Sequence, residues 1–165
     1  MTGFQMDQIR AFTSKLFVGD TFDHFLVKEA EIITFNRFSI DGHLRKEFYT
    51  AEEREEMGMK QLSTWAMIKP FCFSLIKGRR LPESFRIVLK LPQEKARDFL
   101  ETRELPIRPE QLEGLYLNIR YENGGVVCLT GTSLNFFTLD KTVEEQWAEE
   151  VKEFFKRESL EFQEI

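Results

Sequence analysis

The sequence predicts an α+β fold in which helices cover one face of an antiparallel sheet. Three observations predict it. Glycine-containing pairs typical of tight turns stand between strand-like segments, at Asp41-Gly42 and Asn123-Gly124. A third pair of strand-like segments flanks residues 77–84, and helix signals follow each pair. We therefore expect a sheet of three hairpins, each followed by a helix, and one additional N-terminal helix.

Length and composition are those of a globular protein. At 165 residues, the chain fits the usual size of one domain, so we expect residues 1–165 to form a single globular domain. Its 17 phenylalanines predict a core built largely from aromatic rings. Some of these rings could instead line a groove or a contact between subunits.

The N-terminal elements are a helix and a strand. Apolar residues recur at helical spacing from Met6 to Phe17, and Gly19 is suited to end this helix in a left-handed conformation. Residues 23–35 have strand-type composition, but their apolar alternation slips. Either this strand runs past its neighbours or a bulge re-aims its side chains.

The first hairpin is predicted at Asp41-Gly42, a pair that favours a two-residue turn with positive φ angles. In that register Ile40 would face His43. Thr50, followed three residues later by Glu53, matches a capping box, which predicts that a helix begins there.

The second hairpin is predicted from residues 66–76 and 85–91, joined by residues 77–84. Pro70 has no N–H group, so its strand would be an edge strand or bulged. Pro92 suits the first turn of a helix, which predicts a helix over residues 93–101.

The third hairpin is predicted over residues 115–132, with its turn at Asn123-Gly124. Gly131 indicates a bulge, and residues 134–139 are expected to continue the sheet. Thr142 and Glu145 match another capping box, and the final helix, Val143 to Arg157, has an apolar stripe opposite its acids.

Several classes of protein are disfavoured. No apolar run approaches the ~20 residues of a membrane span, and the first ten residues lack the pattern of a signal peptide. Cys72 and Cys128 each lie in an apolar run, which indicates buried free thiols and a reducing cytoplasm. There is no glycine-rich phosphate loop, HExxH, CxxC, nucleophile elbow or calcium loop. Missing motifs lower the expectation of an enzyme without excluding one, and no cofactor can be named.

Charge is distributed unevenly. The net charge of −5 argues against general nucleic-acid binding. Residues 60–108, however, carry 11 basic and 5 acidic groups, whereas both flanking segments are acidic. This basic middle segment can pair with the flanks or present a positive face to an anion, and nucleic-acid binding through it remains an alternative hypothesis.

Two sets of residues are candidate sites. The first is a paired-carboxylate or metal-assisted hydrolase site of His24, Glu29, Glu31 and His43, although the same residues also fit a solvated strand and hairpin. The second is a basic loop of Lys77, Arg79 and Arg80, which could bind an anionic small molecule or an acidic protein, or could simply be solvated. Lys69, Arg86 and Lys90 could extend this loop.

The preferred hypothesis from these residues is a non-catalytic binding domain that uses the basic loop. Self-association as a homodimer is also possible, given the surplus of phenylalanine and the predicted edge strand at Pro70. The C-terminal helix could offer an acidic surface to a partner, although a solvated outer face explains the same acids.

The segment "TFDHFL…EA…TF…F.IDG", within residues 21–42, resembles a group of short uncharacterised proteins from anaerobic Gram-positive bacteria that form a domain of unknown function. The resemblance extends over most of the chain. It implies a stand-alone bacterial cytosolic protein without an assigned activity, and it transfers no catalytic residue.

Overall fold

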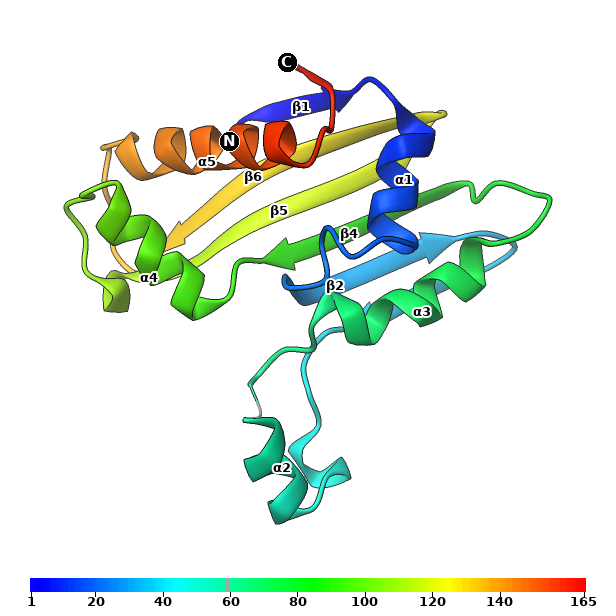
Figure 1. Ribbon diagram of the computed structural model, residues 1–165, viewed down its shortest axis with the longest axis horizontal. Coiled ribbons are helices and arrows are strands. Elements are labelled where there is room, and N and C mark those ends of the chain that lie inside the picture. The colour runs from blue at the N-terminus through cyan, green and yellow to red at the C-terminus, as the bar shows by residue number, and fades with distance from the viewer. Residues whose placement is uncertain (59) are drawn as a thin grey trace.

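The computed structural model describes residues 1–58 and 60–165. Its centre is one antiparallel sheet of seven strands, in the order β3-β2-β4-β5-β6-β1-β7 (Figure 1). The strands are β1 (Gly3–Met6), β2 (Leu26–Ile33), β3 (Arg37–Asp41), β4 (Ser84–Lys90), β5 (Leu112–Glu122), β6 (Gly125–Leu134) and β7 (Phe162–Glu164).

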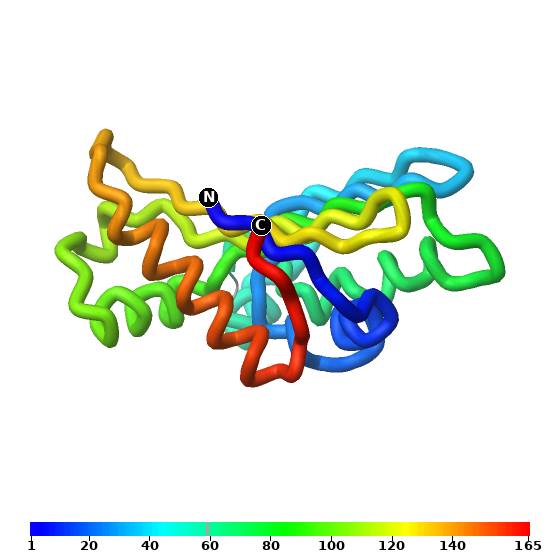
Figure 2. Tube along the Cα trace, turned by 90° about the horizontal axis from the view of Figure 1, so that it is seen from above, coloured from blue at the N-terminus to red at the C-terminus, as the bar shows by residue number. Residues whose placement is uncertain are grey.

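The helices lie mainly on one side of this sheet (Figure 2). They are α1 (Ile9–Phe17), α2 (Ala51–Met57), α3 (Trp65–Ile76), α4 (Gln93–Thr102) and α5 (Thr142–Arg157), with the short 3₁₀ helices η1 (Lys46–Phe48) and η2 (Pro109–Gln111). The predicted α+β class is confirmed. Within the described part of the chain, no helix has the length and apolar character that crossing a membrane requires.

Aromatic rings fill the space between sheet and helices, as the composition predicts. Phe4 and Phe155 meet edge to face with ring centroids 5.6 Å apart, and Phe22 and Phe154 do so at 5.5 Å. Trp65 is fully buried, and its Nε1 donates a hydrogen bond of 2.7 Å to the carbonyl of Leu16, which joins α3 to α1. Edge-to-face pairs add to the stability from burial.

The hairpin of β5 and β6 confirms its prediction. Asn123 and Gly124 both have positive φ angles, of 52° and 73°, as this turn type requires. The final helix also occupies the predicted residues, and its apolar stripe is buried against the sheet. The capping box of α2 is present, with the hydroxyl of Thr50 accepting from the Glu53 amide.

The predicted turn at Asp41-Gly42 is wrong. Strand β3 ends at Asp41, and β2 and β3 are joined instead through residues 34–36. Ile40 therefore pairs with Ala30 and not with His43. Gly42 lies so close to β2 that a Cβ atom on it would be 1.7 Å from the Val27 carbonyl oxygen. Glycine is needed here because the backbone of β2 passes very close to it. The local sequence does not distinguish such a glycine from one that forms a turn.

The predicted strand over residues 66–76 is also wrong, because these residues form helix α3. Thr64 caps it through a hydrogen bond from the Met67 amide, and Pro70 lies inside it on the exposed side. Short apolar runs are ambiguous between strand and buried helix. Strand β4 therefore pairs with β2 and β5, so the three-hairpin arrangement is wrong in its second unit.

Smaller differences concern element ends. Met6 belongs to β1, which with β7 was not predicted, and Gly19 does not take a positive φ angle. The bulge predicted in residues 23–35 is present between Val27 and Glu29. In β5 and β6 the bulge is at Glu113 and not at Gly131, because Gly131 pairs regularly.

The region between β6 and α5 also departs from its prediction. Strand β6 ends at Leu134, so residues 135–139 do not continue the sheet. Thr142 is the first residue of α5 and not its cap. The Thr142 amide donates a hydrogen bond to the carboxylate of Asp140. This bond gives the amide an acceptor at the start of α5, where a capping box was predicted.

Candidate functional site

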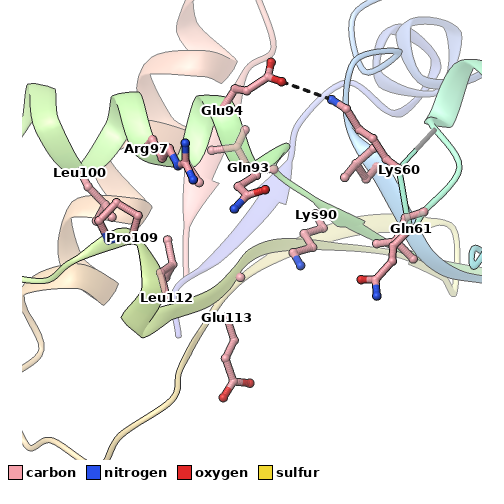
Figure 3. Close-up of a pocket in the computed structure, with 15 residues that line it drawn as sticks. Lys60, Gln61, Lys90, Gln93, Glu94, Arg97, Leu100, Pro109, Leu112 and Glu113 are labelled. Carbon is pink, nitrogen blue, oxygen red and sulfur yellow. Dashed lines mark ion pairs between the residues drawn. The ribbon is translucent and has the colours of Figure 1, made fainter. Parts of the chain in front are cut away.

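A pocket of about 550 Å³ lies beside the N-terminal end of α4 (Figure 3). One wall is α4, the opposite wall is the segment at residues 60–62, and the ends of β4 and β5 lie between them. The lining residues are Leu26, Lys60, Gln61, Leu62, Lys90, Leu91, Gln93, Glu94, Ala96, Arg97, Leu100, Pro109, Leu112, Glu113 and Gly114.

Backbone hydrogen bonds hold the wall at residues 60–62 in place. The Ser63 amide donates to the Gly42 carbonyl at 2.8 Å, and the Val27 amide donates to the Ser63 carbonyl at 2.8 Å. The Gly42 amide in turn donates to the Lys28 carbonyl at 3.0 Å. These bonds form a clasp of Val27, Lys28, Gly42 and Ser63. Because Val27 and Lys28 belong to the bulged part of β2, the bulge helps to hold residues 60–62 at the pocket.

The opposite wall follows from the chain between β4 and α4. The Leu91 amide donates to the Leu115 carbonyl at 2.9 Å, so the chain leaves the sheet only after Leu91. Pro92, with φ −57° and an extended ψ of 148°, then precedes the first turn of α4. Ala96 and Leu100 face the pocket from successive turns of the helix and are buried. Helical spacing thus gives the pocket an apolar floor.

Three cations border the pocket: Lys60, Lys90 and Arg97. Figure 3 shows Lys60 on one side, Arg97 on the helix at the other side, and Lys90 between them. The Lys60 ammonium lies 3.9 Å from a Glu94 carboxylate oxygen, which is a long ion pair. Among the described residues, Lys90 and Arg97 have no carboxylate within ion-pair distance.

The N-terminal end of α4 adds hydrogen-bond donors. No side chain caps it, because Pro92 is the N-cap residue. The first amides of a helix have no acceptor within the helix and carry a partial positive charge. Gln93, the first helical residue, brings a side-chain amide to the same place, and Gln61 brings another from the facing wall.

Two acids line the pocket but do not neutralise it. The side chain of Glu94 is 82 % exposed. Glu113 accepts a hydrogen bond of 3.0 Å from the Ser133 hydroxyl and extends away from α4 and Arg97 (Figure 3). The centre of the pocket therefore presents more positive charge and donors than negative charge.

Tyr116 lies next to this pocket on the open face of the sheet. The ammonium groups of Lys28 and Lys90 lie 5.1 and 6.0 Å from its ring centroid. Its ring packs directly over Gly114, where a Cβ would be 2.7 Å from the phenol atoms. Burial, and secondarily the charge of Glu113, raise the pKa of Tyr116. A neutral phenol here would be available as a hydrogen-bond donor.

A second cleft, of about 310 Å³, lies between α4 and α5. His24 lines it, with its ring centroid 4.6 Å from that of Phe25. Burial, then the charge of Lys95, lower the pKa of His24, and Asp23 opposes this shift. Arg103, the most enclosed cation of this cleft, is bound by Glu150 at 2.6 Å. Its charge is therefore already compensated.

The four residues of the predicted hydrolase site do not share one pocket. His24 lies in the α4–α5 cleft, and Glu31 lines a shallow hollow on the open face of the sheet. Glu29 accepts a hydrogen bond of 2.9 Å from Arg86, and His43 bonds Asp41 at 2.6 Å. In the part of the chain that the structure describes, no group of three or more His, Cys, Asp or Glu side chains could hold a metal ion.

The predicted basic loop is exposed. Lys77, Arg79 and Arg80 lie between α3 and β4, and none of them lines a described pocket. The residues expected to extend it point elsewhere. Lys69 bonds Asp23 at 2.7 Å, Arg86 bonds Glu29, and Lys90 belongs to the α4 pocket.

Sequence reasoning missed Lys60, Gln93 and Arg97 as site residues. The only signal was the basic excess of residues 60–108, which contains all three cations of the α4 pocket. No local motif joins these residues, since the pairing of β2, β4 and β5 brings them together.

The model of a family of unknown function (DUF5721) matches residues 15–163. Comparisons with curated proteins and with solved structures gave no match.

Proposed function

The chain belongs to the family of unknown function DUF5721, and we propose that it is a non-catalytic binding domain for a small anionic molecule. The site is the α4 pocket, and the ligand carries a phosphate or carboxylate group attached to an apolar part. The observation that supports this proposal is that Lys60, Lys90 and Arg97 all line one pocket with an uncapped helix N-terminus.

The chemistry of the pocket favours an anion. Arg97 can donate two parallel hydrogen bonds to a carboxylate or phosphate, and Lys90 supplies a point charge at the border of the same pocket. The free amides of the α4 amino terminus favour negative charge at the same place. Because Lys90 and Arg97 have no carboxylate partner among the described residues, an anion would not have to displace one from them.

The apolar floor selects for more than a bare ion. Leu26, Leu62 and Leu91 are buried under the charged rim. A pocket of about 550 Å³ falls in the size range of small-molecule sites, which commonly combine apolar walls with a few placed polar groups. An aromatic or aliphatic substituent on the anion would contact these leucines and gain affinity from burial.

Thermal unfolding of the full chain with phenyl phosphate and inorganic phosphate tests this proposal. We expect both anions to raise the midpoint, as a ligand of the native state must. Phenyl phosphate should bind about tenfold more tightly, since burying roughly half of its ring contributes about 1.4 kcal/mol.

Two variants test whether phenyl phosphate binds in the α4 pocket. Arg97→Gln removes a two-pronged charge-assisted donor and Lys90→Gln removes a single ammonium charge, and each should weaken phenyl phosphate binding about tenfold to hundredfold. Lys95→Gln is the matched control, because Lys95 is on the same helix but lines the α4–α5 cleft, and it should bind as the wild type does. Equal affinity for phenyl phosphate in the wild type and all three variants would contradict the assignment of the α4 pocket as the binding site.

A further inference from the structure

Helix α3 exposes an unusually apolar outer face. Its inner residues, including Trp65 and Cys72, are buried against the rest of the protein. Its one charged residue, Lys69, also turns inward to Asp23 and to the Gly19 carbonyl. The remaining residues are exposed and uncharged, and we call them the α3 face: Ala66, Met67, Pro70, Phe71, Phe73 and Ser74.

In the monomer, the apolar side chains of the α3 face are exposed to water, which is unfavourable in free energy. Phe71, at the middle of the helix, is 66 % exposed. A helix that is apolar on all sides is usually covered on all sides, and contiguous exposed apolar patches mark interaction surfaces. The α3 face therefore has the character of an interaction surface.

Residues 44–58 form a second unpartnered feature, which we call the arm. Figure 1 shows it projecting from the body of the protein, and none of its residues is buried. The Leu44 amide donates to the Gln61 carbonyl at 2.8 Å at the base of the arm, and the other described hydrogen bonds of the arm are local, such as that of 3.0 Å from Arg54 to the Lys46 carbonyl. Helix α2 has seven residues, and a helix this short is not stable in water without packing.

The arm and the basic loop carry opposite charges. Helix α2 contains Glu52, Glu53, Glu55 and Glu56 against a single cation, Arg54. The basic loop contains Lys77, Arg79 and Arg80 against Glu83. The arm lies at the N-terminal end of α3, and the basic loop lies at its C-terminal end (Figure 1). Within one chain they are separated by the length of α3.

We propose that the α3 face is the interface with a second copy of this chain. The two α3 helices pack antiparallel about a two-fold axis, with the α3 faces in contact. This arrangement places the acidic arm of each chain beside the basic loop of the other. A two-fold axis repeats every contact, so both arms and both loops are paired at once.

Analytical ultracentrifugation of the full chain over a concentration series tests this dimer. We expect the wild type to dimerise and Phe71→Glu to weaken the dimer at least about thirtyfold, as truncation of a central interface residue does. Because Phe71 is largely exposed, the variant should keep its fold, which circular dichroism would check. A monomeric wild type at all concentrations would overturn the proposal and would leave the α3 face to another protein.

Charge reversal separates this interface from any other. Arg79→Glu with Arg80→Glu places acids beside an acidic arm, and Glu55→Lys with Glu56→Lys places basic arms beside a basic loop. Each double variant should dimerise about tenfold more weakly alone. Mixed together, the two variants should form a heterodimer of near wild-type affinity, because both of its contacts are then attractive. Absence of this rescue would overturn the pairing of arm and loop.

Discussion

Replacing Gly42 by alanine should destabilise the protein and disturb the α4 pocket together. A Cβ atom at this position would lie 1.7 Å from the Val27 carbonyl oxygen and 2.6 Å from its carbonyl carbon. Both are backbone atoms of β2, so no side-chain rotation relieves the overlap. The two segments would have to separate by roughly 1.3 Å to reach a tolerable contact distance.

The magnitude follows from the clasp around Gly42. Separation breaks or lengthens three backbone hydrogen bonds, which link Gly42 to Lys28, Ser63 to Gly42, and Val27 to Ser63. Each contributes about 1 kcal/mol net, so the free energy of unfolding should fall by about 3 kcal/mol. Since Ser63 follows the pocket wall at residues 60–62, affinity for phenyl phosphate should fall as well.

Urea unfolding followed by circular dichroism measures the loss. Gly58→Ala is the matched control, because Gly58 has a φ angle of 55° but a Cβ atom added to it would meet nothing within 4 Å. It should cost only about 1 kcal/mol, from the left-handed conformation. A Gly42→Ala protein whose free energy of unfolding lies within about 0.5 kcal/mol of the wild type, the usual effect of a surface substitution, would refute this reasoning.

Three further predictions concern buried groups. Burial raises the pKa of Cys72 to about 12 and raises that of Cys128, so neither thiol should react with iodoacetamide at pH 8 until the protein unfolds; rapid labelling of the native protein would contradict this. Because burial lowers the pKa of His24 from 6.5, the unfolded chain binds this proton first as the pH falls. The free energy of unfolding should therefore decrease as the pH falls from 6.5 towards the lower pKa of the folded state. In urea titrations at several pH values, His24→Gln should show a smaller decrease with pH than the wild type. Trp65→Phe removes the hydrogen bond to the Leu16 carbonyl and should lower the free energy of unfolding by about 2 kcal/mol, and an unchanged urea midpoint would count against that bond.

The elements that could be predicted from sequence are those set by local chemistry. Asn123-Gly124 forms its turn because both residues tolerate positive φ angles, and Thr50 with Glu53 closes a hydrogen-bonded box within a few residues. The final helix follows from a long periodic apolar stripe. In each case the stabilising contacts lie near one another in the chain or along one face.

The elements that could not be predicted depend on distant contacts. Asp41-Gly42 has the same local character as Asn123-Gly124, but its backbone is set by β2 and the segment that contains Ser63. Residues 66–76 are apolar on both faces, so neither a period of two nor one of 3.6 residues stands out. Strands β1 and β7 are too short for a clear alternation.

The candidate site could be predicted only as a charge excess. The basic character of residues 60–108 indicated an anion, but the exposed loop of Lys77, Arg79 and Arg80 was the conspicuous local cluster. The α4 pocket instead gathers single cations from β4, from α4 and from the segment at residues 60–62. Their proximity depends on strand order, which the sequence alone does not reveal.

The most direct test of the binding site is a ¹H–¹⁵N chemical-shift titration of the full chain with phenyl phosphate. The account predicts that the largest saturable shifts occur at the amides of Gln93, Glu94 and Gly114, which border the α4 pocket. Shifts concentrated at Lys77, Arg79 and Arg80, with the amides at the start of α4 unmoved, would contradict it and would assign anion binding to the basic loop.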